Sequence, residues 1–145
     1  MILTEEEKIE MLNSIKEDEL DEYKATVWGV IVPETKKVLK KYGRAAGAFA
    51  AFENKYCYVG ITDKYIAFAT INTFNTSQMM DALNIDFDAI KKVKVKNQLI
   101  RKLIYIYTND GKLKLSLSSI TLGSKLNKKN QVDGIKYIIN KLKSL

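Results

Sequence analysis

The stretch from Phe87 to Leu117, FDAIKKVKVKNQLIRKLIYIYTNDGKLKLSL, decides the fold of this chain. Apolar and polar residues alternate from Ile90 to Lys96, apart from one slip at Lys91-Lys92, and alternate strictly from Lys112 to Leu117. This period of two indicates strands with one buried face. Asp110-Gly111 between alternating runs is the strongest short-range signal for a β-hairpin. The stretch therefore predicts consecutive antiparallel strands.

The register of the hairpin follows if Asp110 and Gly111 are the two central residues of its turn. Asn109 then faces Lys112, Ile106 faces Leu115 and Ile104 faces Leu117. A slip by one residue would place lysines on the apolar face, which a half-buried sheet disfavours at every pair. The prediction puts Ile104, Ile106, Leu113, Leu115 and Leu117 on one face and Tyr105, Tyr107, Lys112, Lys114 and Ser116 on the other.

The composition is that of an ordinary globular protein. The 145 residues are 46% apolar and 28% charged, with one proline and seven glycines, so we expect a single folded unit with short linkers. No apolar run approaches the roughly 20 residues that a membrane-spanning helix needs. The acidic N-terminus lacks the features of a signal peptide, and the lone Cys57 is typical of a reducing compartment. We therefore expect a cytoplasmic protein.

Charge is distributed unevenly along the chain. Residues 1–22 hold nine acidic and two basic residues, a balance of −7, whereas residues 23–145 hold eight acidic and 22 basic residues, a balance of +14. Such asymmetry is consistent with an anionic partner. The cations are 22 lysines and only two arginines, however, and arginine is the residue preferred for phosphate recognition. The same lysines therefore also fit a merely solvated surface.

Capping signals and periodicity predict the remaining elements. The capping box Thr4–Glu7 begins a helix over about residues 4–19, with Ile9, Leu12 and Ile15 on its apolar stripe. β-Branched and aromatic residues predict strands at Tyr23–Val32, Tyr56–Thr62 and Tyr65–Asn72. Short helical segments are expected between Pro33 and Gly43 and at an insertion carrying Met79, Met80, Ala82 and Leu83.

A final amphipathic helix closes the chain. Its apolar residues recur at spacings of three and four, and Gly134 inside it predicts a close contact beneath the helix. The fold class is α+β, a small antiparallel barrel or folded sheet with a C-terminal helix. Residues 1–22 form an acidic N-terminal helix, and residues 23–145 form the main domain. The stripe of the final helix is Val132, Ile135, Ile138, Ile139, Leu142 and Leu145.

Short motifs carry a resemblance to a known family. The segment Tyr58–Ile66, YVGITDKYI, resembles the Gly-aliphatic-Thr-Asp-Lys-Arg-Leu-Ile hairpin of bacterial pleckstrin-homology-like domains of the YokE type. Phe87–Val93 is similar to the strand that follows it, and the Asp110-Gly111 hairpin and terminal helix come in the same order. The resemblance covers residues 22–145. Tyr65 stands where arginine is usual, and the acidic helix and the Val32–Gly43 segment look like additions.

The resemblance implies a half-open barrel of two roughly orthogonal sheets with a helix closing one end. Domains of this kind bind phospholipids, peptides or proteins, so the fold alone does not select a ligand. It implies an interaction domain rather than an enzyme.

The residues themselves also argue against catalysis. The chain has no histidine and one cysteine, which excludes zinc sites and Cys-His nucleophile pairs. Asp86 and Asp88 are interpreted as flanking a strand, and Asp63 and Asp110 as turn residues. No glycine-rich phosphate loop is found. We therefore expect no enzyme activity, no cofactor and no metal.

The strongest candidate site is the outward face of the hairpin. Aromatic rings interleaved with cations can stack bases and neutralise phosphates. The alternative is that the tyrosines lie under the N-terminal helix, which needs somewhere to bury its apolar stripe, and this alternative is favoured. The candidate ligand-binding residues are Lys92, Lys94, Lys96, Tyr105, Tyr107, Lys112 and Lys114.

The sequence thus predicts a non-catalytic binding domain that presents a preformed surface to a protein or an anionic ligand. A protein partner is the first expectation, and the oligomeric state stays open. The alternatives are a nucleic-acid binder that uses the lysine and tyrosine face, and an anionic-membrane binder with the methionine insertion as its wedge. A further hypothesis is that the −7 segment folds over the +14 remainder and masks it.

Overall fold

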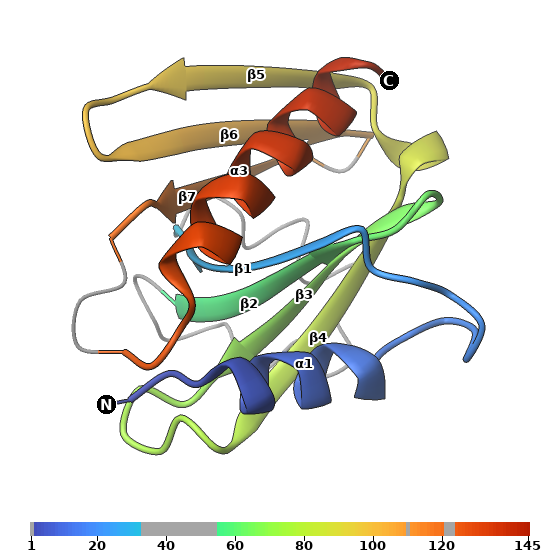
Figure 1. The fold of residues 1–145 in the computed structure, drawn as a ribbon. Helices are drawn as coiled ribbons and strands as arrows, with labels where there is room; N and C mark the ends of the chain where they lie inside the picture. Colours follow the sequence, from blue (N-terminus) through green and yellow to red (C-terminus); the bar gives the residue numbers. More distant parts are fainter. Residues whose placement is uncertain (1, 33–54, 110, 121–123) are drawn as a thin grey trace.

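The computed structural model describes residues 2–32, 55–109, 111–120 and 124–145. Seven strands lie between an N-terminal and a C-terminal helix (Figure 1). In chain order the elements are α1 (Glu5–Ser14), β1 (Ala25–Ile31), β2 (Lys55–Ile61), β3 (Tyr65–Ile71), β4 (Met79–Asp86), the 3-10 turn η3 (Phe87–Ala89), β5 (Lys92–Asn97), β6 (Arg101–Thr108), β7 (Gly111–Ser118) and α3 (Lys128–Lys143).

All seven strands belong to one antiparallel sheet in the order β4-β3-β2-β1-β7-β6-β5. The sheet is not closed, because β4 and β5 are its two edges. Among the described residues, the two halves join where β1 pairs with β7 at Val30 with Ser116 and Ile31 with Leu115. The antiparallel sheet with a helix at each end of the chain confirms the expected α+β class.

The main core lies on the inner faces of both halves of the sheet. Alternate residues of β6 and β7, such as Ile104, Ile106 and Leu115, are fully buried there. Ile135, Ile138 and Leu142 of α3 pack into the same cluster, which makes α3 the closing element. An ideal Cβ on Gly134 would lie 2.6 Å from Val27 Cγ1, so the predicted close contact beneath the helix is confirmed.

Helix α1 covers the outer face of the other half of the sheet. Thr4 caps it by accepting a hydrogen bond from the Glu7 amide, as the capping box predicts. Leu12 and Ile15 are fully buried against β2, β3 and β4. The helix is shorter than predicted, and Ile9 was wrongly assigned to its buried stripe, since that side chain is exposed. Lys8 is buried instead, and its ammonium contacts Glu5 at 3.0 Å.

Tyr65 anchors the segment that follows α1. Its ring is fully buried, and its hydroxyl donates to Asp21 at 2.8 Å while accepting from the Glu17 amide. Lys64 forms an ion pair of 2.7 Å with the same carboxylate. Tyr65 therefore connects the loop after α1 to the β2–β3 turn, which gives this departure from the family motif a structural role beside the added helix.

Gln131 bridges the joint between the two halves. The β1–β7 ladder ends before Trp28 and Ser118. The Gln131 amide of α3 fills this place, accepting from the Trp28 N–H at 3.1 Å and donating to the carbonyls of Trp28 and Ser118 at 3.0 and 2.8 Å. One side chain, 1% exposed, thus satisfies the backbone that the sheet leaves unpaired.

The hairpin register differs from the prediction by two residues. Tyr107 pairs with Lys112, Ile106 with Leu113 and Ile104 with Leu115. Gly111 is not a central turn residue but the first residue of β7, with a φ of 136° that favours glycine. The two predicted faces survive, because a shift by two residues keeps every side chain on its side.

Two other predictions need comment. The methionine segment is not a helical insertion: Met79 to Asp86 form strand β4, which pairs with β3 along its length. Asp81, Ala82 and Leu83 are buried in that strand, so it is no protruding wedge. The short helix expected between Pro33 and Gly43 lies outside the described residues.

Candidate functional site

The seven predicted site residues lie together on the outward face of β5, β6 and β7. Tyr107 pairs with Lys92 on one side and Lys112 on the other, and Tyr105 pairs in the same way with Lys94 and Lys114. Directly paired residues of an antiparallel sheet share a face. We call this set the basic face: Lys92, Lys94, Lys96, Tyr105, Tyr107, Lys112 and Lys114.

The lysines of the basic face surround its tyrosine rings. The ammoniums of Lys96, Lys112 and Lys114 lie 5.7, 5.2 and 5.6 Å from the centre of the Tyr105 ring. Lys92 lies 5.6 Å from the ring of Tyr107. These are cation–π distances. Tyr105 is only 9% exposed, so this ring is not open for a base to stack on.

Helix α1 does not cover these tyrosines, and that favoured interpretation is wrong. The helix packs against β1, β2 and β3 and lies at the opposite end of the molecule from β5 (Figure 1). The apolar stripe of α1 finds its partner on the outer face of β2–β4 because Tyr58, Tyr65, Ala67 and Ala69 provide an apolar surface there.

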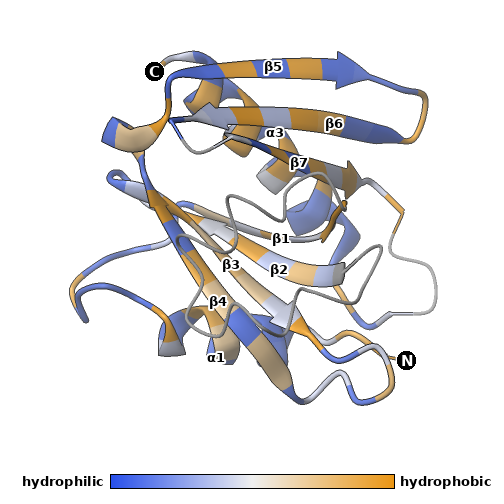
Figure 2. Cartoon of the chain, turned by 180° about the vertical axis from the view of Figure 1, so that it is seen from behind, coloured by the Kyte–Doolittle hydropathy of each residue, from blue (hydrophilic) through white to orange (hydrophobic). Residues whose placement is uncertain are grey.

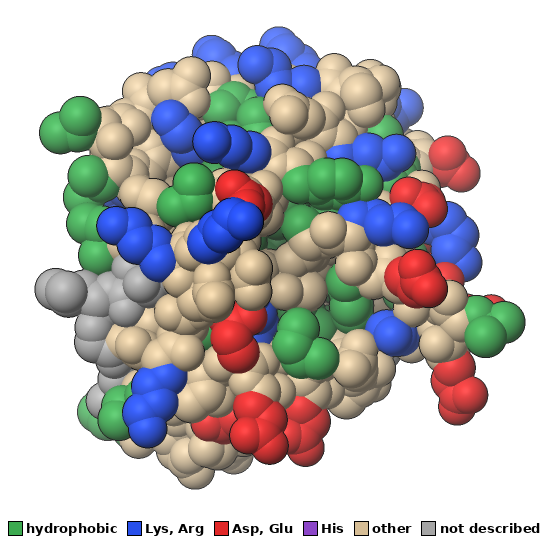
Figure 3. Space-filling model, in the orientation of Figure 1, with side chains coloured by type: hydrophobic (Ala, Val, Ile, Leu, Met, Phe, Trp, Pro, Cys, Tyr) green, Lys and Arg blue, Asp and Glu red, His purple; other side chains and the backbone are tan. Residues whose placement is uncertain are grey.

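The charges of the molecule separate in the same way. No acidic residue occurs between Asp88 and Asp110, a segment with five lysines and one arginine, and none occurs between Asp110 and Asp133. In Figure 3, Lys and Arg side chains gather over β5 and the end of α3, whereas Asp and Glu side chains lie over α1. The strands of the basic face therefore carry cations without neighbouring acids in sequence.

The turn between β5 and β6 extends this site and was missed by the sequence analysis. Leu99 is fully exposed there, Ile100 is half exposed, and Arg101 follows them. With Trp28 and Tyr56 they line a groove of about 530 Å³ on the outer face. The signal was present, because two adjacent aliphatic residues at a hairpin turn are unusual where polar turn residues are the rule.

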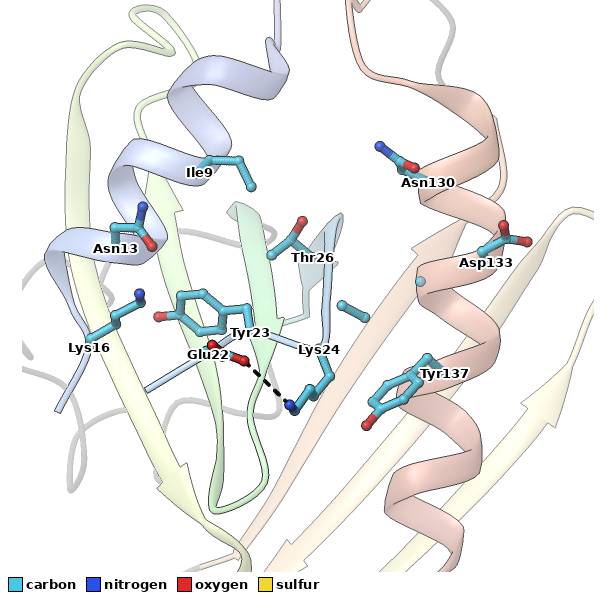
Figure 4. Close-up of a pocket in the computed structure, with 12 residues that line it drawn as sticks. Ile9, Asn13, Lys16, Glu22, Tyr23, Lys24, Thr26, Asn130, Asp133 and Tyr137 are labelled. Atoms are coloured by element: carbon cyan, nitrogen blue, oxygen red, sulfur yellow. Dashed lines mark ion pairs between the residues drawn. The ribbon is translucent and has the colours of Figure 1, made fainter. Parts of the chain in front are cut away.

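A second groove, of about 650 Å³, lies between α1 and α3 (Figure 4). Ile9 and Lys16 come from α1, and Asp133 and Tyr137 from α3, with Tyr23 on its floor. Its charged side chains are two lysines, one glutamate and one aspartate, which balance. Lys24 pairs with Glu22 at 3.6 Å, and Lys16 lies 5.6 Å from the Tyr23 ring. The groove thus presents no dominant charge to a ligand.

Carboxylates with shifted pKa values occur only near the loop after α1, among the described residues. Burial and the neighbouring Asp86 raise the pKa of Glu17. The hydrogen bond from Lys64, followed by that from Tyr65, lowers the pKa of Asp21. These contacts join the loop to the β2–β3 turn and the end of β4, which is a structural role. Burial raises the pKa of the Cys57 thiol, so this cysteine is a poor nucleophile.

No group of three or more potential metal ligands occurs among residues 2–32, 55–109, 111–120 and 124–145. Within the same residues, neither helix has the length and apolar character needed to cross a membrane.

Known proteins resemble this chain in three-dimensional structure and not in sequence. No protein-family model and no curated protein sequence matches it. Among solved structures, the hSac2 domain of the human phosphoinositide phosphatase Sac2 is similar with a TM-score of 0.50 and 7% identity, covering 93% of this chain and 75% of that one. The C-terminal domain of an unknown protein from Leishmania infantum matches with a TM-score of 0.47 and 12% identity, covering 84% of each chain.

Proposed function

We propose that this chain is a non-catalytic, cytoplasmic interaction domain that binds an anionic partner through its basic face. One observation carries the proposal: five lysines from three adjacent strands converge on one face, and no acidic residue lies on those strands. A cluster of cations raises the local potential and attracts ligands of the opposite charge.

We assign the chain a pleckstrin-homology-like fold. Seven antiparallel strands in two halves, followed by a helix that packs into the shared core, fit this architecture. The likeness to the hSac2 domain supports the fold and carries no information on a ligand at 7% identity. The short motifs around Gly60 and Asp63 support the bacterial form of the family.

The chemistry of the face favours recognition of charge density. Lysine presents a compact point charge, whereas arginine presents a planar fork that selects the geometry of one phosphate. The basic face contains only lysines as cations. It therefore suits an extended anionic surface better than a single stereospecific anion, and its affinity must fall steeply as salt rises.

The structure gives less support to binding of single-stranded nucleic acid by base stacking. Tyr105 is shielded, which removes the central ring that a single-stranded nucleic acid would need. Nucleic-acid binding, if present, would rest on phosphate contacts alone.

The test compares two variants of equal net charge. Lys92, Lys94 and Lys96 are all exposed on edge strand β5 and are changed together to glutamine. Lys128, Lys129 and Lys136, exposed on α3, are changed together as the control. Binding to phosphatidylserine-containing vesicles and to a short single-stranded oligonucleotide is measured between about 50 and 200 mM salt.

We expect the β5 variant to lose roughly 100-fold in affinity for the anionic probe that binds, at about 1 kcal/mol per lysine. The α3 variant should keep its affinity within about threefold, because α3 packs against the inner face of the sheet, on the side away from the basic face. Equal losses in the two variants, or no binding of wild type to either probe, would overturn the proposal.

A further inference from the structure

Exposed aliphatic side chains cluster at one tip of the molecule. Leu99 is fully exposed, and Ile100 and Ile120 are 49% and 40% exposed. The amide and hydroxyl of Ser119 both donate to the Ile100 carbonyl, at 3.0 and 3.2 Å, which places Ile120 beside the β5–β6 turn. Figure 2 shows this turn as hydrophobic, and Figure 3 shows hydrophobic side chains gathered at the same end of β5 and β6. We call these three residues the tip.

Cations flank the tip. Lys96 is the last residue but one of β5, close to the turn, and Arg101 and Lys102 begin β6 just after it. Arg101 Nε donates to Gln98 Oε1 at 3.1 Å, so its guanidinium is held at the turn. No carboxylate occurs within ten residues of Leu99 on either side.

The two other most exposed apolar residues, Phe74 and Leu20, lack this combination. Phe74 is fully exposed on the β3–β4 loop, but residues 72–80 contain no charged side chain. Leu20 is 87% exposed, and acidic residues surround it at positions 18, 19, 21 and 22. Aliphatic exposure and positive charge therefore coincide at the tip and at neither of these two residues.

We propose that the tip docks this domain on an anionic phospholipid surface, with Leu99 and Ile100 entering the acyl boundary and Lys96, Arg101 and Lys102 contacting headgroups. This inference rests on the proposed function and specifies its partner. An aliphatic tip has nothing to bury itself in on a free phosphate or a nucleic-acid backbone, whereas a bilayer supplies both an apolar layer and surface charge.

The basic face supports the same orientation. Lys96 belongs to both the basic face and the rim of the tip, so the lysines of β5 continue from the tip along one strand. Attraction to the headgroups brings the domain to the surface, and burial of the tip then holds it there. Two partly inserted side chains give reversible attachment, because short apolar insertions need an electrostatic second signal.

The test distinguishes the contribution of the aliphatic tip to vesicle binding from that of the lysines. The full chain carrying Leu99→Ser and Ile100→Ser is compared with wild type and with Phe74→Ser, which changes a fully exposed apolar residue on a neutral loop. Partition is measured on vesicles of phosphatidylcholine with and without phosphatidylserine, and binding of the oligonucleotide is measured in parallel. Since all three side chains are exposed, the variants should keep the thermal stability of wild type, which a melting curve checks.

We expect the tip variant to lose about 100-fold in partition to the anionic vesicles, which corresponds to removing two buried aliphatic side chains. Phe74→Ser should bind like wild type, and binding of the oligonucleotide should be the same in all three proteins. Vesicles without phosphatidylserine should bind weakly.

A labelled tip gives an independent measurement. Cys57 is buried, so a thiol-reactive, polarity-sensitive fluorophore labels Leu99→Cys or Phe74→Cys selectively. Anionic vesicles should shift the emission of the label at position 99 to the blue and leave the label at position 74 unchanged.

The outcomes distinguish the two proposals. Unchanged partition of the tip variant, together with loss of binding in the β5 lysine variant, would overturn the docking inference and leave the basic face as the binding surface. Equal partition to neutral and anionic vesicles would also overturn the inference. Failure of wild type to bind any anionic probe would overturn both proposals.

Discussion

At the scale of single residues, Gln131 shows how one buried side chain joins two halves of a sheet. Its amide contacts three backbone groups of β1 and β7 where their ladder has ended. A polar residue on the buried face of a helix breaks the apolar pattern that identifies the helix. The periodicity of α3 could therefore be predicted from sequence, but the role of Gln131 depends on Trp28 of β1, 103 residues away in the chain.

Replacing Gln131 by methionine should destabilise the fold by about 2–4 kcal/mol, because it keeps the volume of the side chain and leaves three part-buried backbone groups without their partner. Chemical denaturation measures the free energy of unfolding. Asn130→Met, on the exposed neighbouring position of α3, is the control and should change stability by less than about 0.5 kcal/mol. A similar, small effect of both substitutions would contradict the bridging role.

Glu17 should make the stability of the fold depend on pH. Burial and Asp86 raise its pKa above the ordinary value of 4.5, so the folded state holds this proton more tightly than the unfolded state. Stability is then lost as pH rises from 4.5 through the raised pKa. Glu17→Gln should raise the urea midpoint at about pH 7 and not at about pH 4. Glu10→Gln, on the exposed side of α1, should lack this pH-dependent gain.

At the scale of elements, the alternation of apolar and polar residues identified strands β5, β6 and β7. It did not identify strand β4, in which two polar residues are buried or half-buried by contacts with other elements. The alternation in β5, β6 and β7 predicted both faces correctly. The hairpin register was wrong by two residues, because Asp110-Gly111 was interpreted as the centre of the turn when Gly111 begins β7. Strand β4 was missed, since Asp81 and Asn84 interrupt its apolar run and are buried or half-buried against neighbours. Such burial follows from tertiary contacts.

Helix α3 should tolerate no side chain at Gly134. Alanine favours a helix by about 1 kcal/mol, but its Cβ would lie 2.6 Å from Val27 Cγ1, and overpacking costs about 1–3 kcal/mol. We expect Gly134→Ala to be destabilising in equilibrium unfolding. In the double variant with Val27→Ala the cost should be less than the sum of the two single costs. Strict additivity would mean that the two residues do not compete for the same space.

At the scale of the whole molecule, the charge imbalance could be predicted from sequence and its placement could not. The −7 and +14 segments are plain in the sequence, but the sequence does not show which face of the sheet α1 covers. The position of α1 is set by the apolar outer face of β2–β4, against which Leu12 and Ile15 are buried. The masking hypothesis is therefore wrong for α1, because this helix packs on the outer face of β2–β4 and lies at the opposite end of the molecule from β5 (Figure 1).

This separation of charge should orient the domain toward an anionic partner. The end with β5, β6 and the tip approaches the partner, and the end with α1 faces away from it. Electrostatic attraction at this distance acts mainly on the rate of association, so raising the salt concentration should slow association more than it speeds dissociation.

Mapping the contact on the folded chain by NMR tests the central claim most directly. A soluble polyanion, inositol hexakisphosphate, is added to isotope-labelled protein, and the amide shifts are followed at low and at raised salt. The account predicts shifts concentrated in β5, β6 and β7 around the basic face, fading as salt rises, with α1 and β2–β4 unchanged. Shifts centred on the groove between α1 and α3, or no shifts at all, would contradict it.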